Sequence, residues 1–159
     1  HARPTVSVGI SPAGDIEKNR EELYADAARW GGEEGYVDYL MPQLYYGFEN
    51  SASPFEKTAR QWANLIRCDS VKLYAGLAIY KSGEEDQYAG PESDQKQGPR
   101  YEWINHSDII SRQVAWGRKT QPYAGFALYS YQYSFGDSRS KQLQKEWNAL
   151  SALLENKEK

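Results

Sequence analysis

An alternation of strand-like and helix-like segments most limits what this chain can fold into. Apolar runs predict strands at 4–10, 36–44, 71–80 and 123–130, and a segment with helical periodicity follows each of them. Such alternation is typical of a parallel sheet, because each helix returns the chain to the same end of the sheet. The sequence therefore predicts an α/β fold of four consecutive βα units. Either half of a TIM-type (β/α)8 barrel or a small open doubly wound sheet fits this pattern.

Apolar residues that recur at helical spacing predict the helices. The second helix has the clearest start, with Ser53 as the N-cap, Pro54 as the first helical residue and Glu56 completing a capping box. The other helices are expected at 20–30, from 105–108 to about Gly117, and through the apolar positions Leu143, Trp147, Leu150 and Leu154.

The segments between these elements are expected to be loops. They cover 11–19, 81–104 and the aromatic stretch 131–138. A polar connection as long as 81–104 is usually functional or disordered. Trp103 within it has two interpretations, a lid over a binding site or a hydrophobic staple that leads into the next helix.

Composition and charge argue against several classes of protein. A chain of 159 residues suits one domain, taken here as 1–159. The formal net charge of −3 comes from interspersed acids and bases, which predicts neither a nucleic-acid partner nor a polybasic membrane patch. No apolar run approaches the roughly 20 residues of a membrane helix, and no signal-like segment opens the chain.

No cofactor or metal site is predicted. His1 and His106 stand far apart in the sequence, and the single Cys68 has no ligand partner at useful spacing, so it is expected to be a buried structural thiol. The first strand-to-helix turn lacks the glycine patterns of dinucleotide-binding and phosphate-binding loops. The G-x-S-x-G sequence of serine hydrolases is also absent.

Polar and aromatic residues follow all four apolar runs. Parallel strands bring their carboxyl ends to one edge of the sheet, where α/β proteins place their binding sites. A single tyrosine there is more often a core residue with a hydrogen-bonded hydroxyl than a ligand contact, but four coincident strand ends favour a shared binding face. The predicted substrate-binding residues are Ser11, Gln43, Tyr45, Tyr80, Lys81, Tyr129, Ser130 and Tyr131.

Six segments give the chain a family resemblance. In order, they read GISPAG, LYADAARW, VDYLMPQLYYG, KLYAGLAIYK, WINHSDIISRQVAWGR and GFALYSY. Together they resemble the C-terminal half of the glycosyl hydrolase-like 10 (DUF187) family. The resemblance implies a bacterial (β/α)8-barrel glycosidase, exported or membrane-anchored and hence extracytoplasmic. It also implies a carbohydrate substrate, and it makes the first strand here about the fifth of a barrel, whose N-terminal half this sequence lacks.

Catalytic residues are not assigned from the sequence. Glycosidases use two carboxyl groups, yet no acid stands directly at a strand end, and Asp38 lies near the amino end of its strand, where a structural role is expected. We expect solvated charges at the loop acids Asp15, Glu49, Glu84, Glu85, Asp86 and Asp137. At least one catalytic carboxylate is then expected from the missing half, which would leave the isolated chain inactive.

Two further hypotheses follow from the half-barrel interpretation. The outermost strands would have unpaired edges, so the chain is expected to close them by forming a homodimer. The alternative to an enzyme is a non-catalytic carbohydrate-binding or interaction module with a barrel-derived shape.

Overall fold

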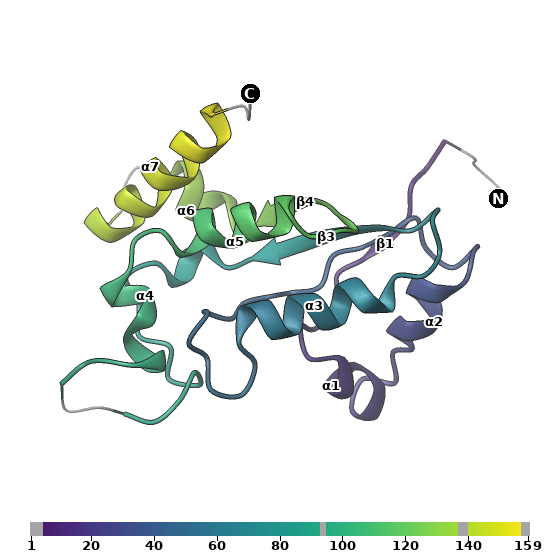
Figure 1. Ribbon diagram of the computed structural model, residues 1–159, viewed down its shortest axis with the longest axis horizontal. Coiled ribbons are helices and arrows are strands. Elements are labelled where there is room, and N and C mark those ends of the chain that lie inside the picture. The colour runs from purple at the N-terminus through teal and green to yellow at the C-terminus, as the bar shows by residue number, and fades with distance from the viewer. Residues whose placement is uncertain (1–4, 93–94, 137–139, 157–159) are drawn as a thin grey trace.

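The computed structural model describes residues 5–92, 95–136 and 140–156 and confirms the α/β fold. Its sheet has four parallel strands in the order β1-β2-β3-β4 (Figure 1). These are β1 (Gly9–Ile10), β2 (Tyr39–Leu40), β3 (Lys72–Leu77) and β4 (Tyr123–Leu128). A strand order that follows the chain is found in consecutive barrel units, whereas doubly wound sheets reverse their order at a switch point.

Seven α-helices and two 3-10 helices are present in the described residues. Three of the α-helices have ten residues or more: α3 (Phe55–Leu65), α5 (Ile109–Arg118) and α7 (Lys141–Glu155). The shorter ones are α1 (Ile16–Glu21), α2 (Ala27–Gly32), α4 (Glu102–Asn105), α6 (Tyr131–Phe135), η1 (Ile79–Lys81) and η2 (Pro99–Tyr101). The helices expected around α3, α5 and α7 are therefore confirmed.

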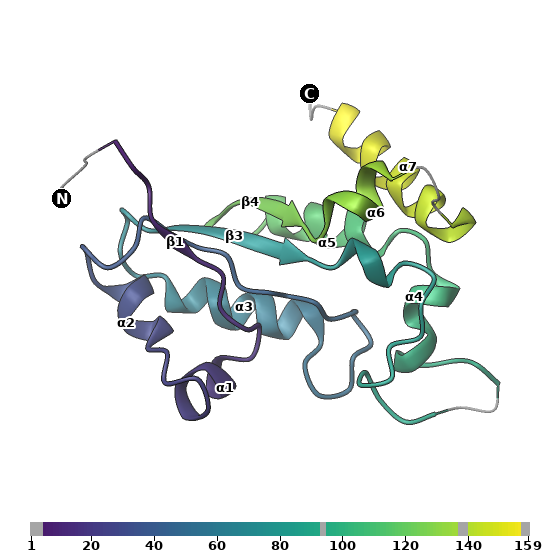
Figure 2. The same ribbon diagram turned by 180° about the vertical axis from the view of Figure 1, so that it is seen from behind.

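The two faces of the sheet differ in chemistry. On the face covered by α3 and α5, Leu40, Leu73 and Leu77 are fully buried and form one core with residues of those helices. Seen from the other side in Figure 2, the strands lie in front of α3. There the half-buried rings of Tyr39 and Tyr74 form a T-shaped contact, with centroids 5.7 Å apart. Only one face of the sheet is thus an apolar core.

Glycines make room for these two tyrosines. A Cβ at Gly9 would overlap the ring of Tyr39, and one at Gly125 would lie 3.2 Å from the Tyr74 ring. Each ring therefore lies over a glycine of the neighbouring strand.

The first two strands are much shorter than expected. Pro42 lacks an N–H, so the regular ladder of β2 stops at Leu40, and two isolated parallel bridges from Gln43, to Ala13 and to Gly76, continue the alignment. At the amino ends of β1 and β2, the Asp38 carboxylate accepts the N–H of Val8 at 2.6 Å. Asp38 thus has the structural role that its position indicated.

The helix expected at 20–30 is wrong, and so is the loop expected at 11–19. Two aspartates start two short helices instead: Asp15 accepts the N–H of Lys18 at 3.0 Å, and Asp26 accepts that of Arg29 at 3.1 Å. The break between α1 and α2 leaves Leu23 54% exposed. The aspartate caps determine where these two helices start, whereas the apolar spacing predicted the wrong boundaries.

The capping box expected at the start of α3 does not form. Pro54 occupies the N-cap position, and no side chain caps the helix. Asn50 instead binds the backbone N–H of Ser53 that a capping box would use. Its Oδ1 accepts this N–H at 2.8 Å and that of Ala52 at 3.1 Å. Ser53 is thereby held in an asparagine turn that precedes the helix.

Three further expectations are corrected. The segments 81–104 and 131–138 are not plain loops, because the first contains η2 and α4 and the second begins with α6. Trp103 is 1% exposed and belongs to the core, so it is no lid. Cys68 is half-buried beside Ser70, with Sγ and Oγ 3.1 Å apart, and is not a fully buried thiol.

Candidate functional site

Three tyrosines meet at the carboxyl ends of the strands. The rings of Tyr45 and Tyr129 stack with centroids 5.8 Å apart and an interplanar angle of 28°. Tyr80 stands edge-on to both, 6.0 Å from each centroid. These residues follow β2, β3 and β4, so the parallel sheet brings together side chains more than eighty positions apart in the sequence. We call Tyr45, Tyr80 and Tyr129 the tyrosine cluster.

A pocket of about 310 Å³ adjoins the cluster, and we call it the strand-end pocket. Its lining includes Gln43, Tyr45, Tyr46, Lys81, Asp86 and Tyr88. Polar donors and acceptors in a concave site with aromatic walls are typical of small-molecule binding sites.

Lys81 is held in place by an ion pair inside this pocket. Its Nζ donates to Asp86 Oδ2 at 2.6 Å and to the carbonyl of Tyr45 at 2.8 Å. The Lys81 side chain is 18% exposed and that of Asp86 only 4%. The ammonium therefore connects the segment after β3 to the backbone of the residue that carries a cluster ring.

Gln43 and Tyr46 complete the pocket wall on the side of β1. The Gln43 amide donates to the carbonyl of Ser11 at 3.3 Å. Gly14 gives space to Tyr46, because a Cβ there would lie 2.6 Å from the Tyr46 ring. Both side chains thus depend on the turn that follows β1.

Three tyrosines at the strand ends have raised pKa values because of burial. Burial raises the pKa of Tyr45, where the neighbouring tyrosines add to the effect, and it raises the pKa of Tyr80, where the carboxylate of Asp86 adds to it. Burial also raises the pKa of Tyr46, beside Asp15. At neutral pH these hydroxyls are uncharged and can donate hydrogen bonds.

A buried glutamate supports the loop behind the cluster. Glu102 in α4 accepts the N–H of Phe48 at 2.8 Å and that of Glu49 at 3.0 Å, and it is 2% exposed. Burial raises its pKa, although the two backbone donors act in the opposite direction. A Cβ at Gly47 would overlap this carboxylate in its present position, and glycine leaves room for it. Glu102 therefore fixes the chain directly after Tyr45 and Tyr46.

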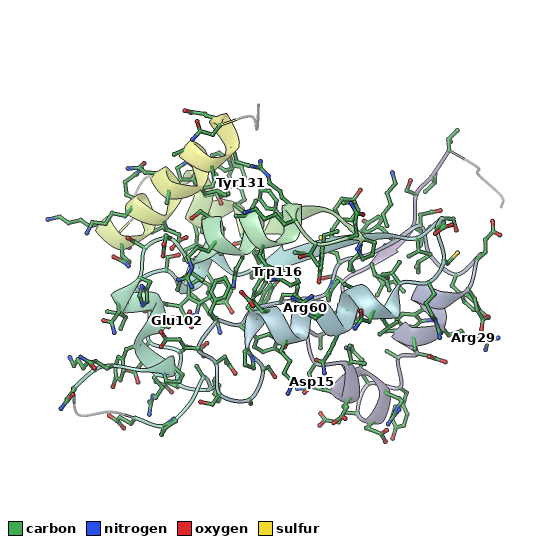
Figure 3. The ribbon with its side chains drawn as sticks, in the orientation of Figure 1. Asp15, Arg29, Arg60, Glu102, Trp116 and Tyr131 are labelled. Atoms are coloured by element: carbon green, nitrogen blue, oxygen red, sulfur yellow. The ribbon has the colours of Figure 1, made fainter. Side chains whose placement is uncertain are left out.

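The structure gathers some of the predicted site residues and separates others. Gln43, Tyr45 and Lys81 line the strand-end pocket, and the rings of Tyr80 and Tyr129 contact that of Tyr45. Ser11 takes part only through its carbonyl, and the carbonyl of Ser130 accepts bonds within α6. Tyr131 is 76% exposed and contacts Phe135, not the cluster. Figure 3 shows it close to α7 in the upper part of the view, with Asp15 in the lower part.

Sequence reasoning missed several residues of the site. Tyr133 contacts Tyr80 at 6.0 Å from α6, and Tyr88 is 92% exposed at the pocket rim. Asp86 was expected to be solvated, which is wrong because it is buried against Lys81. Only the short separation of Lys81 and Asp86 in a polar segment could have indicated their pairing.

The other loop acids have mixed environments. Asp15 caps α1, Glu85 lies 2.7 Å from Arg100, and Glu49 lies 3.9 Å from His106. Glu84 is exposed, as expected, and Asp137 lies outside the described residues. Within 5–92, 95–136 and 140–156, no group of three His, Cys, Asp or Glu side chains could hold a metal ion. In the same part of the chain, no helix is long and apolar enough to span a membrane.

Parallel strands with aromatic and polar side chains at their carboxyl ends define the α/β class that binds ligands at that edge. The model of the family "Glycosyl hydrolase-like 10" matches residues 1–91, which is more than half of the chain. The chain therefore belongs to the glycosyl hydrolase-like 10 family. The matched segment contains β1 to β3, Tyr45, Tyr80 and the Lys81–Asp86 pair.

Curated relatives carry related names. The chain is 37% identical over 97 residues to glycosyl hydrolase DigH of Escherichia coli strain K12, covering 52% of this chain and 22% of that protein. It is 34% identical over 95 residues to glycosyl hydrolase YngK of Bacillus subtilis strain 168, covering 50% and 18%. The chain thus matches about a fifth of the length of each relative. No solved structure matches it.

Proposed function

We propose that this chain supplies one side of the sugar-binding cleft of a glycoside hydrolase that acts on a poly- or oligosaccharide. The tyrosine cluster beside the strand-end pocket is the observation that carries the proposal. The names of the relatives, glycosyl hydrolases DigH and YngK, support the same class of activity.

The cluster suits the chemistry of carbohydrates. Sugar rings have apolar faces made of C–H groups and rims of hydroxyls, so they bind to sites that combine aromatic rings with neutral hydrogen-bonding groups. Tyr45, Tyr80 and Tyr129 offer both ring faces and hydroxyls, and the Gln43 amide adds a donor and an acceptor. Lys81, engaged by Asp86, orients the backbone of Tyr45 and takes part in binding from that position.

Hydrolysis needs carboxyl groups beyond those that the pocket offers. Retaining and inverting glycosidases hold two of them across the scissile bond. In the strand-end pocket, Asp15 caps a helix and Asp86 is paired with Lys81. In this proposal at least one catalytic carboxylate comes from the N-terminal half of the barrel, and the present chain alone is inactive.

A non-catalytic carbohydrate-binding module is the second candidate. The structural engagement of both pocket carboxylates favours it, because that arrangement suits binding without hydrolysis. The two candidates make the same prediction for this chain alone and differ for a longer protein. Release of reducing ends by a protein that includes the N-terminal half would support the hydrolase, and binding without release would support the module.

Calorimetric titration of the chain with neutral oligosaccharides tests the proposal. Cello-, chito- and xylo-oligosaccharides make up the panel, and the variants Tyr45→Ala and Tyr80→Ala remove cluster rings. For the saccharide that binds, each variant is expected to weaken affinity about tenfold. Tyr24→Ala is the matched control, because Tyr24 is 89% exposed on the turn between α1 and α2. Equal affinity for all three variants and the unchanged chain would contradict the proposal.

A further inference from the structure

A second group of aromatic rings lies on the surface of α6 and α7. Tyr131 and Phe135 are one helical turn apart, with centroids 5.0 Å apart, and they are 76% and 58% exposed. The half-buried Trp147 of α7 stands edge-on against Phe135 at 5.5 Å. We call these three residues the aromatic platform.

The platform differs from the isolated exposed tyrosines of this chain. Single exposed apolar residues are common on protein surfaces, but contiguous exposed rings mark binding sites. Trp147 supports Phe135 from behind, so the exposed rings have a fixed base on a fifteen-residue helix. The platform is therefore an ordered surface that presents its rings to solvent.

Continuity with the tyrosine cluster indicates what occupies this surface. The segment 129–135 runs from Tyr129 of the cluster directly into α6. Tyr133, on the same short helix, contacts Tyr80 of the cluster at 6.0 Å. One side of α6 therefore touches the cluster, while Tyr131 and Phe135 extend the aromatic surface away from it.

The side chains of residues 129–136 further limit the class of ligand. Residues 129–136 read YSYQYSFG and contain no charged side chain. Rings with hydroxyls and an amide suit a neutral ligand with alternating apolar faces and polar rims, whereas an anionic polymer would require basic residues.

From this arrangement we propose that the aromatic platform is a remote contact for a neutral saccharide chain longer than the tyrosine cluster can hold. The inference depends on the proposed function, since the same ligand must occupy the cluster. Tyr131 and Phe135 then contact sugar units that lie beyond those at Tyr45, Tyr80 and Tyr129. A short saccharide fills the cluster and does not reach the platform.

Saccharide length separates the two contacts in one experiment. The unchanged chain, Tyr131→Ala, Phe135→Ala and the control Tyr24→Ala are titrated calorimetrically with the disaccharides and hexasaccharides of the cello-, chito- and xylo- series. Each platform variant is expected to weaken hexasaccharide binding about three- to tenfold and to leave disaccharide binding within about twofold. Both substituted side chains are largely exposed, so the variants should fold, which circular dichroism checks.

The outcomes distinguish this inference from the proposed function. If the unchanged chain binds the hexasaccharide and both platform variants bind it equally well, the platform inference is wrong while the cluster proposal stands. If the unchanged chain binds no saccharide of either length, both proposals are wrong. Sedimentation that shows a dimer, with Tyr131→Ala shifting it to monomer, would assign the platform to a protein interface and would also overturn the inference.

Discussion

The carboxylate of Glu146 in α7 accepts the N–H of Ile110 in α5 at 2.6 Å. Its other oxygen accepts the N–H of Ile109 at 3.1 Å. Glu146 is fully buried, and it takes the place of the side-chain cap that α5 lacks. A glutamate in the last helix thus completes the first turn of another one.

Stability should depend on pH through this glutamate. Burial raises the pKa of Glu146 to about 7, against the lowering effect of the backbone donors, and Asp108 adds to the rise. A folded-state pKa above the unfolded value means that protonation stabilises the fold. The contribution is complete below the unfolded value of 4.5 and is lost as pH rises through about 7. We expect the free energy of unfolding to fall by about 3 kcal/mol across this window.

Urea unfolding between pH 4 and 8 measures this dependence. Glu146→Gln removes the titrating group, so its pH dependence should be flatter than that of the unchanged chain. Glu155→Gln is the control, because Glu155 is exposed in the same helix. Parallel curves for Glu146→Gln and the unchanged chain would show that Glu146 does not titrate in this range.

The contact between Gly47 and Glu102 predicts a strong coupling. Gly47→Ala should destabilise the chain by about 2 kcal/mol, because the new Cβ displaces the carboxylate that accepts two backbone N–H groups. Adding Gly47→Ala to Glu102→Ala should cost less than it does alone, since the overlapping carboxylate is gone. A double-mutant cycle with urea unfolding measures the coupling. Strictly additive effects would show that Gly47 and Glu102 are not coupled.

Lys81 should matter for stability as well as for binding. Lys81→Met leaves the buried carboxylate of Asp86 without its cation and should lower the free energy of unfolding by about 2 kcal/mol. Lys81→Met combined with Asp86→Leu should recover part of this loss, because no unpaired charge remains. Thermal unfolding compares the stability of the variants. If Lys81→Met is as stable as the unchanged chain, the Lys81–Asp86 pair does not stabilise the fold.

The outer edge of β4 predicts self-association. In the described part of the chain no strand pairs with that edge, and β4, which reads YAGFAL, contains no charge that would block another strand. We expect light scattering to give the mass of a dimer. Ala124→Lys places a charge at an exposed edge position and should restore the monomer. A monomeric mass for the unchanged chain would contradict this prediction.

The sequence predicted the features that depend on chain topology. Parallel strands alone require Tyr45, Tyr80 and Tyr129 to approach one another, so this group could be predicted from strand ends. The sequence did not indicate which of two polar residues accepts the backbone N–H of Ser53: Asn50 does so before α3, where the Glu56 side chain was expected to act. It also did not reveal Glu102 and Glu146, because their partners lie more than thirty positions away.

The central claim is that the strand ends form one sugar-binding opening. Amide and side-chain NMR shifts of the chain, recorded during titration with the neutral oligosaccharide that binds, test it most directly. The account predicts shift changes at Gln43, Tyr45, Tyr80, Lys81 and Tyr129 at a single affinity, with Tyr24 and Tyr36 unchanged. Changes confined to other surfaces, or absent at all five residues at millimolar saccharide, would contradict it.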